Sequence, residues 1–316
     1  MRRVSAILGL GAFVTASHGM LRAAALPHIA VGLDPIDASS NFFVAQSQGL
    51  FTAAGVAVDA QRTTNGAAGA AAVVSGALDV SSMNVASLAS ALQRNVPLVV
   101  VALSEMYSAK TPTTQLLVMK DSPVTGPHDL SGKTVAVNAI GGLADIATHL
   151  WLQKNAVDPA SVAVVEMPFS VMPDALVTGR VSAVFVAEPG LSAAKRRGAR
   201  VLASAFDAIA PQFLIGACVA NRGWANQNGD ALQRFAAAMH RGSIWANQHH
   251  DQTAIISSTF IHEDVAAIRA QTRATFPENE SPAQLLQPVF DAVARYKNTP
   301  AVNADDVISP ALYKSS

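Results

Sequence analysis

The sequence predicts an α/β fold built on mainly parallel sheets, and two observations support this class. Short apolar runs, which are typical of buried strands, alternate with segments of helical periodicity from residue 28 to about residue 205. Half of the 316 residues are hydrophobic and only 14% are charged, so the chain has enough apolar surface for a large core. Strands that helices cover on both faces are expected to pair in parallel.

The first series of elements lies between residues 28 and 104. We expect strands at HIAVGL, VAVDAQRT, ALDVSS and PLVVVALS, and helices at residues 41–54, 66–75 and 85–94. Glycines 55 and 76 mark the ends of the first two helices, because glycine readily adopts the left-handed backbone that follows a helix.

A second series follows the strand-like run TTQLLVMK. We expect further strands at KTVAVN, SVAVVEMP, SAVFVAE and ARVLAS, with helices at residues 143–155, 172–178 and 191–197. The alternation again predicts an α/β unit. We interpret residues 111–205 as a second, smaller unit inserted into the first.

From QFLIGACVAN onward the pattern is mostly helical. Leu232, Phe235 and Met239 recur at helical spacing and predict a helix with one face in the core. Ser281 before Pro282 predicts the start of a further helix. Cys218 is the single cysteine, so the chain has no internal disulfide, and we expect a small buried hydrophobic residue there.

The N-terminus has the pattern of a cleavable secretory signal peptide. Arg2 and Arg3 precede the apolar run VSAILGLGAFVTA, which is too short to span a bilayer. Ala23 and Ala25 form an A-x-A cleavage site, so we expect residues 1–25 to be removed. Export of a chain without disulfides predicts the bacterial periplasm.

Charge and motif content exclude several function classes. Lys plus Arg and Asp plus Glu both number 22, so we expect no binding to nucleic acid or to an anionic membrane surface. The sequence has no G-x-S-x-G, H-E-x-x-H or strand-linked G-x-G-x-x-G motif, which argues against an enzyme. IHED (261–264) and QHHD (248–251) are the most metal-like clusters, and we interpret both as polar helix ends. We therefore predict no cofactor, no metal and no catalytic residues.

Four segments, in this order, resemble a known family. They are NFFVAQSQGLFTAAGVAVDA, SGALDVSSMN, DLSGKTVAVNAIGG and MPDALVTGRVSAVFVAEP. Together they resemble the nitrate/sulfonate/taurine-type solute-binding proteins of bacterial ABC importers, a family that includes binders of thiamine pyrimidine precursors. The resemblance extends over residues 28–300, nearly the whole mature chain.

The resemblance implies a type II periplasmic-binding-protein architecture. Two lobes with mixed, mainly parallel sheets would be joined by two crossovers, near residues 107–114 and 205–212. Lobe 1 would comprise residues 26–110 plus 206–316, and lobe 2 residues 111–205. A small solute would bind between the lobes of a monomer that delivers it to the ABC permease subunits in the inner membrane.

Candidate ligand-binding residues of the first lobe are polar groups that follow its strands, where ligands gather in parallel α/β sheets. They are Ser39, Ser40, Asn41, Ser82 and Asn84. Each either caps the next helix or donates a hydrogen bond to the ligand. Tyr107 lies near the predicted hinge beside Glu105, where it either contacts the solute or is a buried hinge aromatic.

Candidate residues of the second lobe lie at two helix starts. Gly141, Gly142 and Leu143 belong to the turn AVNAIGGL, whose backbone N–H groups suit the oxygens of a carboxylate, sulfonate or nitrate. The alternative is an ordinary strand-to-helix turn with glycines for backbone reasons. Glu188 follows a strand and precedes a helix, so it either pairs with a ligand amino group or caps that helix.

We expect the periplasmic solute-binding component of an ABC transporter, which captures a small organic anion or zwitterion of the sulfonate or taurine kind by hinge closure. If Glu105 and Glu188 both line the site, an inorganic anion is disfavoured. Alternatives are a binder of a pyrimidine or thiamine precursor or an aromatic carboxylate, and a sensory binding protein. A pyrimidine-synthase-like enzyme is less favoured, because the chain has one cysteine and an export signal.

Overall fold

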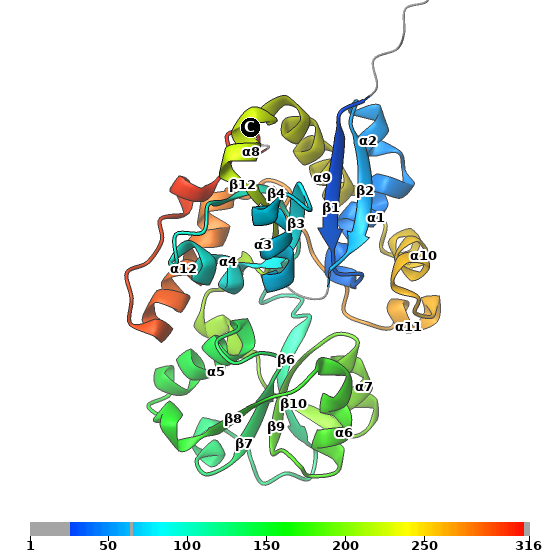
Figure 1. The fold of residues 1–316 in the computed structure, drawn as a ribbon. Helices are drawn as coiled ribbons and strands as arrows, with labels where there is room; N and C mark the ends of the chain where they lie inside the picture. Colours follow the sequence, from blue (N-terminus) through cyan, green and yellow to red (C-terminus); the bar gives the residue numbers. More distant parts are fainter. Residues whose placement is uncertain (1–25, 64–65, 313–316) are drawn as a thin grey trace, which may run out of the picture.

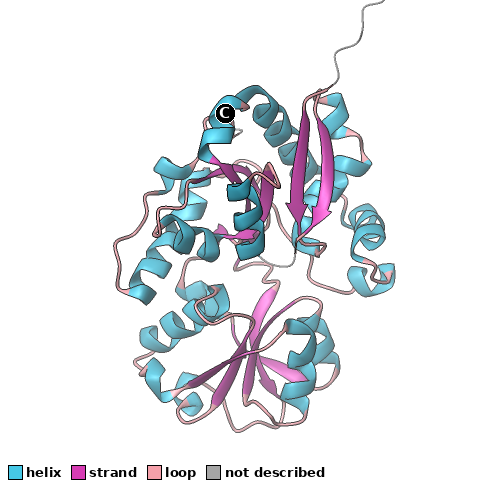
Figure 2. Ribbon diagram, in the orientation of Figure 1, coloured by secondary structure: helices cyan, strands magenta, loops and turns pink. Residues whose placement is uncertain are grey.

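The structure is a computed structural model that describes residues 26–63 and 66–312, so the signal peptide predicted at residues 1–25 lies outside the described residues. The chain forms two α/β lobes, each around a five-stranded sheet, and a two-stranded sheet lies between them (Figure 1). Both five-stranded sheets mix parallel and antiparallel neighbours. Helices surround each sheet (Figure 2), which confirms the predicted α/β class.

The sheet of lobe 1 has four strands that run in one direction and one that runs against them. The strands are β1 (His28–Leu33), β2 (Ala57–Arg62), β3 (Val80–Asn84), β4 (Leu98–Leu103) and β12 (Gly216–Asn221). Their order is β2-β1-β3-β12-β4, with β12 antiparallel to both of its neighbours. The sequence did not predict β12, because a short apolar run cannot be told from a buried helix segment by periodicity, and the residues that follow it are helical. Cys218 lies on this strand and is 1% exposed.

Helices of lobe 1 come from both ends of the chain. They are α1 (Ser40–Ser47), α2 (Leu50–Ala53), α3 (Gly66–Ser75), α4 (Val85–Leu92), α8 (Arg222–Gln227), α9 (Gly229–Gln248), α10 (His250–Ile261), α11 (Val265–Arg269) and α12 (Pro282–Lys297), with the short 3-10 helices η1 (Asp37–Ser39) and η6 (Ala304–Val307). The single helix expected at residues 41–54 is wrong. Gly49 adopts φ +66°, a left-handed conformation that separates α1 from α2.

Lobe 2 repeats the plan of lobe 1 on a smaller scale. Its strands are β6 (Thr114–Met119), β7 (Thr134–Val137), β8 (Ala163–Glu166), β9 (Ala183–Ala187) and β10 (Ala199–Ala203). Its helices are α5 (Leu143–Lys154), α6 (Met172–Val177) and α7 (Gly190–Arg196), with η2 (Pro127–Leu130), η3 (Pro159–Ser161), η4 (Phe169–Val171) and η5 (Ala205–Ala208). The order β10-β6-β9-β7-β8 again places one reversed strand, β6, next to last in the sheet.

The two crossovers between the lobes pair with each other. β5 (Met106–Ser108) and β11 (Gln212–Leu214) form an antiparallel ladder in which Tyr107 lies opposite Phe213. The two rings stack with their centroids 5.0 Å apart, and Phe206 packs edge-on against Tyr107 at 5.2 Å. This aromatic cluster belongs to a hydrophobic core that includes residues of both lobes.

The crossovers turn the same end of each sheet toward the junction between the lobes. In lobe 1, β4 ends at Leu103, shortly before β5 begins. In lobe 2, β6 begins at Thr114, shortly after β5, and the antiparallel β9 ends opposite Thr114 at Ala187. The parallel strands of both lobes therefore end at the junction, the edge where parallel α/β sheets bind ligands.

Lobe 1 is held together by a close approach of α1 and α9. A Cβ atom added at Gly242 of α9 would lie 2.3 Å from the backbone oxygen of Asn41 and 3.1 Å from the Cβ atom of Ala45. The only residue that fits there without a shift of α1 is glycine.

None of the described helices is both long and apolar enough to cross a membrane.

We expect Gly242→Ala to lower the free energy of unfolding by about 1–3 kcal/mol, because the added methyl group must push α1 away. Gly229→Ala is the control on the same helix, since a Cβ atom there meets nothing within 4 Å, and we expect a change below about 0.5 kcal/mol. Chemical denaturation measures both variants. Equal stabilities would contradict the close packing.

Candidate functional site at the junction of the lobes

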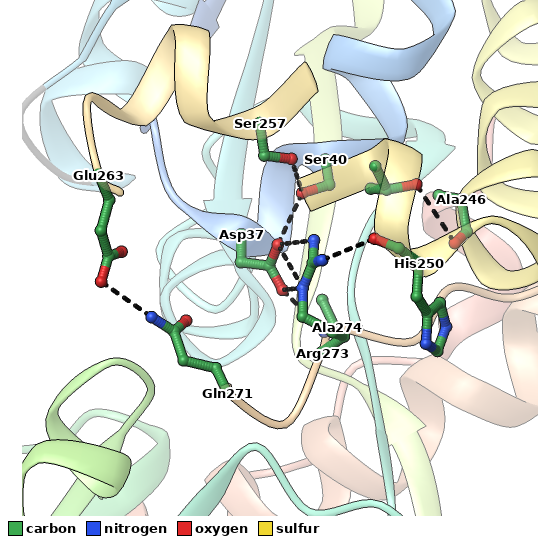
Figure 3. Close-up of polar contacts among 10 residues, drawn as sticks. Asp37, Ser40, Ala246, His250, Ser257, Glu263, Gln271, Arg273 and Ala274 are labelled. Atoms are coloured by element: carbon green, nitrogen blue, oxygen red, sulfur yellow. Dashed lines mark hydrogen bonds and ion pairs between the residues drawn. The ribbon is translucent and has the colours of Figure 1, made fainter. Parts of the chain in front are cut away.

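An ion pair organises the side of the junction that lobe 1 contributes (Figure 3). Arg273 donates from Nε and Nη2 to the carboxylate of Asp37, with an Nη2–Oδ1 distance of 2.5 Å. The Ala274 N–H and the Ser40 hydroxyl donate to the same carboxylate, at 2.9 Å each. The side chains are 8% and 15% exposed, so this pair fixes the segment around Arg273 against the start of α1.

The segment fixed by Arg273 carries a backbone donor that reaches lobe 2. The Thr272 N–H donates to Glu188 Oε1 at 3.1 Å. Glu188 also accepts from the Ser192 N–H at 2.9 Å and from the Ser192 hydroxyl at 2.8 Å, so it caps the start of α7. Of the two roles predicted for Glu188, the structure has the helix cap, and the same carboxylate also joins the lobes.

A second contact joins the lobes on the left of Figure 1, where α12 lies above α5 and opposite to α7 and α11. The Tyr296 hydroxyl of α12 donates to Asp145 Oδ2 of α5 at 2.7 Å. Burial raises the pKa of Tyr296 to about 12, and the hydrogen bond and charge of Asp145 raise it as well. The phenol therefore keeps its proton. The His149 ring packs edge-on against Tyr296 at 5.0 Å.

The turn before α5 uses most of its N–H groups internally. The Ile140 N–H donates to Glu166 Oε2, the Gly141 N–H to Asp145 Oδ2, and the Gly142 N–H to the Ala139 oxygen. The N–H groups of Leu143 and its successor Ala144 have no acceptor within the described residues. The free donors of this helix start therefore begin at Leu143, one residue after the glycine pair.

The SSN stretch after β1 forms internal bonds in this structure. Ser39 donates to the Asp34 oxygen at 2.8 Å, and Ser40 lies 2.7 Å from the hydroxyl of Ser257 on α10. Asn41 Nδ2 donates to the Leu103 oxygen and to Ser243 Oγ on α9, at 3.1 Å each. These bonds position α1, and ligand contact by the three residues stays a prediction.

Two of the other three lobe 1 candidates also form internal hydrogen bonds, and one does not. Asn84 caps α4 by accepting from the Ala86 N–H at 2.9 Å. Tyr107 is buried and donates to Asp207 Oδ1 at 2.7 Å, and burial raises the pKa of its hydroxyl. Ser82 differs from both, because its half-buried hydroxyl has no partner within the described part of the chain. Ligand contact by Ser82 and by Asn84 and Tyr107 stays a prediction.

Glu105 lies between β4 and β5, where lobe 1 meets the hinge. Its side chain is 9% exposed, and Oε1 accepts from the Thr113 hydroxyl at 2.8 Å. Burial raises the pKa of this carboxyl to about 7; the Thr113 hydrogen bond lowers it and the charge of Asp37 raises it further. The Thr113 oxygen accepts from the Glu188 N–H at 3.0 Å, so Thr113 links both glutamates.

Apolar side chains lie exposed in loops at the same ends of the sheets. Ile36 follows β1 and is 47% exposed, and Ile140 follows β7 and is 61% exposed. Because each follows the carboxyl end of a parallel strand, both belong to loops at the junction. The junction therefore offers hydrocarbon surface together with hydrogen-bonding groups.

The two sequence clusters that look most like metal sites form other contacts in the structure. No three His, Cys, Asp or Glu side chains in the described ranges lie close enough together to hold a metal ion. In IHED, Asp264 caps α11 by accepting from the Ala266 and Ala267 N–H groups. In QHHD, Asp251 pairs with Arg269, and the His249 ring stacks on Trp245.

Sequence reasoning did not find Arg273, Thr272 or Glu263 at the junction. Arg273 lies 236 residues from Asp37, in a segment without regular structure, and no motif marks it. Glu263 accepts from Gln271 Nε2 at 2.9 Å; burial raises the pKa of its carboxyl, as do the charges of Asp37 and Glu188. The one available signal was the acidic Asp37 next to the SSN stretch.

Comparison with known proteins places these features in a family. The family model described as "NMT1/THI5 like" matches residues 38–253. A comparison with curated proteins finds no match. Among solved structures, the periplasmic aliphatic sulphonate binding protein SsuA from Escherichia coli is similar, with TM-score 0.74 and 20% identity over 91% of this chain and 99% of that one.

Two further solved structures show the same fold. The alkanesulfonate-binding protein SsuA from Xanthomonas axonopodis pv. citri, bound to MOPS, has TM-score 0.70 and 17% identity over 92% of this chain and 100% of that one. The periplasmic nitrate-binding protein NrtA from Synechocystis PCC 6803 has TM-score 0.70 and 13% identity over 90% of this chain and 86% of that one. The predicted two-lobed architecture is confirmed by these similarities.

We expect Arg273→Leu to lower the free energy of unfolding by about 3 kcal/mol, because it leaves the buried Asp37 carboxylate without its cation. Arg269→Leu is the matched control four residues earlier. It removes an exposed pair with Asp251, whose side chains are 46% and 78% exposed, and should cost less than about 1 kcal/mol. Chemical denaturation compares the two, and similar losses would contradict the structural role of Arg273.

We expect Glu105 to make stability depend on pH. Its pKa in the folded chain, about 7, is above the ordinary value of 4.5, so the folded state binds the proton more tightly. The free energy of unfolding should therefore fall as pH rises from about 4.5 to about 7, by roughly 3 kcal/mol. Glu105→Gln, which keeps an acceptor for Thr113, should remove this part of the dependence in denaturation curves. An unchanged pH slope in the variant would refute the assignment.

Proposed function

The chain belongs to the NMT1/THI5-like family, and on this premise we propose that it is the periplasmic solute-binding component of an ABC importer. It captures a small organic anion or zwitterion, of the sulfonate or taurine kind, between its two lobes. Three of the solved structures that it resembles are named as binding proteins for sulfonates or nitrate, which supports a transport role over a catalytic one.

The observation that carries the proposal is the orientation of the sheets. The carboxyl ends of the parallel strands in both lobes face one junction, across a hinge formed by β5 and β11. Helix starts at such an edge present N–H groups that bind small ligands. Two facing edges joined by a hinge suit a protein that encloses its ligand.

The solute class follows from the groups that the junction leaves free. The N–H groups of Leu143 and Ala144 at the start of α5 suit the oxygens of a sulfonate or carboxylate. The Ser82 hydroxyl can add a hydrogen bond from lobe 1. Ile36 and Ile140 favour a solute with a hydrocarbon part over an inorganic anion such as nitrate.

Capture occurs by movement of lobe 2, from β6 to η5, as one unit against the remainder of the chain. The closed arrangement is held by the Glu188–Thr272 and Tyr296–Asp145 contacts. A solute that binds groups of both lobes stabilises the closed arrangement by its higher affinity for it. The closed monomer then docks on the permease subunits of the importer in the inner membrane.

A solute screen tests the proposal. We expect alkyl and aminoalkyl sulfonates to raise the melting temperature of the mature chain, and solution scattering to show that the bound protein matches this closed structure. The Tyr296→Phe variant should bind the same sulfonates about 2- to 10-fold more weakly, because it removes a hydrogen bond of the closed state alone. Lys297→Met, which removes a bond to Ser90 within lobe 1, is the control.

The screen can also reject the proposal. If neither sulfonates nor carboxylates change the melting temperature or the scattering profile, the chain is not a binder of this class. If Tyr296→Phe and Lys297→Met weaken binding equally, closure through α5 and α12 does not contribute.

A further inference from the structure

Glu105 is a largely buried acid at the junction, and one of its carboxylate oxygens has no hydrogen bond. Thr113 occupies Oε1, whereas Oε2 has no partner within the described residues. In those residues Gln46 Oε1 is the one fully enclosed side-chain oxygen that lacks a partner, so Glu105 Oε2 keeps some contact with solvent. The residue is 9% exposed, with Oε1 bonded to Thr113 and Oε2 free of a protein partner within the described residues.

No cation of the described residues neutralises this group. Arg273 uses Nε and Nη2 on Asp37, and Nη1 donates to the His250 oxygen. The charged group that acts on Glu105 is a second acid, Asp37. An ionised carboxylate that is buried without a counter-charge carries a large desolvation cost, and a cation beside it relieves that cost.

The other acids of the junction add to the same negative potential. The backbone N–H of Glu188 donates to the Thr113 oxygen, so Glu188 follows the residue that holds Glu105. Glu263 lies near enough to Asp37 and Glu188 for both charges to raise its pKa. Arg196 faces Glu263 and lowers that pKa, so it balances one acid of the group. The acidic side of the junction favours a positively charged group on the solute.

We infer that the Glu105 carboxylate binds a positively charged nitrogen of the solute, so that the site selects amino-bearing organic anions over plain ones. The solute is then a zwitterion whose anionic end lies at the start of α5 and whose ammonium donates to Oε2. This inference rests on the proposed function and narrows its ligand class.

Matched probe pairs test the inference on the full mature chain. Taurine and ethanesulfonate differ in one amino group, as do 3-aminopropanesulfonate and propanesulfonate. By titration calorimetry at about pH 8 we expect the amino member of a pair to bind at least about tenfold more tightly. Glu105→Gln should abolish this advantage and leave the affinity for the plain sulfonate within about threefold.

Asp121→Asn is the control for the loss of one negative charge. Asp121 is exposed beyond the end of β6 that is distant from the hinge, and the variant should keep the full preference for the amino probe. Thermal melts of all variants establish that they are folded.

The pH dependence of the wild-type chain gives a second measurement that needs no variant. The amino and sulfonate groups of the probes keep their charges between about pH 5.5 and pH 8, whereas Glu105 gains a proton as pH falls through about 7. The groups that face it are the Thr113 hydroxyl, which donates to Oε1, and the charge of Asp37, which pairs with Arg273. Taurine should therefore bind more weakly at pH 5.5, and ethanesulfonate should not.

The outcomes separate the inference from the proposed function. Equal binding of the amino and plain probes, or an equal loss of both in Glu105→Gln, overturns the inference and leaves the sulfonate binder intact. If none of the four probes binds, the proposed function fails in this class and the inference fails with it.

Discussion

The antiparallel pairing of the two crossovers is the constraint on which the molecule depends. β5 and β11 cross together between the lobes, and the stacked rings of Tyr107 and Phe213 fix them to one another. Because this ladder connects the two lobes, the carboxyl ends of the parallel strands in one lobe face those in the other. The helix starts, the capping residues and the buried Glu105 meet at one place as a consequence of that orientation.

The contacts that close the junction share one design. Asp145 accepts from the Gly141 N–H just before α5, and Glu188 accepts from the N–H and the hydroxyl of Ser192 in the first turn of α7. Each carboxylate accepts one further hydrogen bond from the opposite lobe. When the lobes separate, each carboxylate keeps its bond at the helix start and loses one partner. A net hydrogen bond contributes about 1 kcal/mol, so two of them bias the chain toward closure without locking it. A bound solute can then decide between the two arrangements.

Periodicity predicted most of the strands and helices, because they alternate between short apolar runs and longer amphipathic ones. It did not find β12, whose short apolar run fits a buried helix as well, nor the break at Gly49, where Gly55 offered an equally good stop signal. For the candidate site, the sequence located the loops that follow the strands but not the hydrogen-bond partners of their residues. The link between Glu188 and Thr272 joins residues 84 apart, and nothing local encodes it. Similarly, the occupied N–H of Gly141 depends on a side chain one turn later.

The place of Cys218 in the centre of β12 has a practical consequence. Burial raises the pKa of its thiol to about 12, so it stays protonated and unreactive in the folded chain. As the chain holds no other cysteine, thiols introduced at exposed positions would be the only sites for maleimide dyes. One engineered residue on each lobe would accept a donor and acceptor fluorophore, which turns the folded chain into an optical reporter of its own motion.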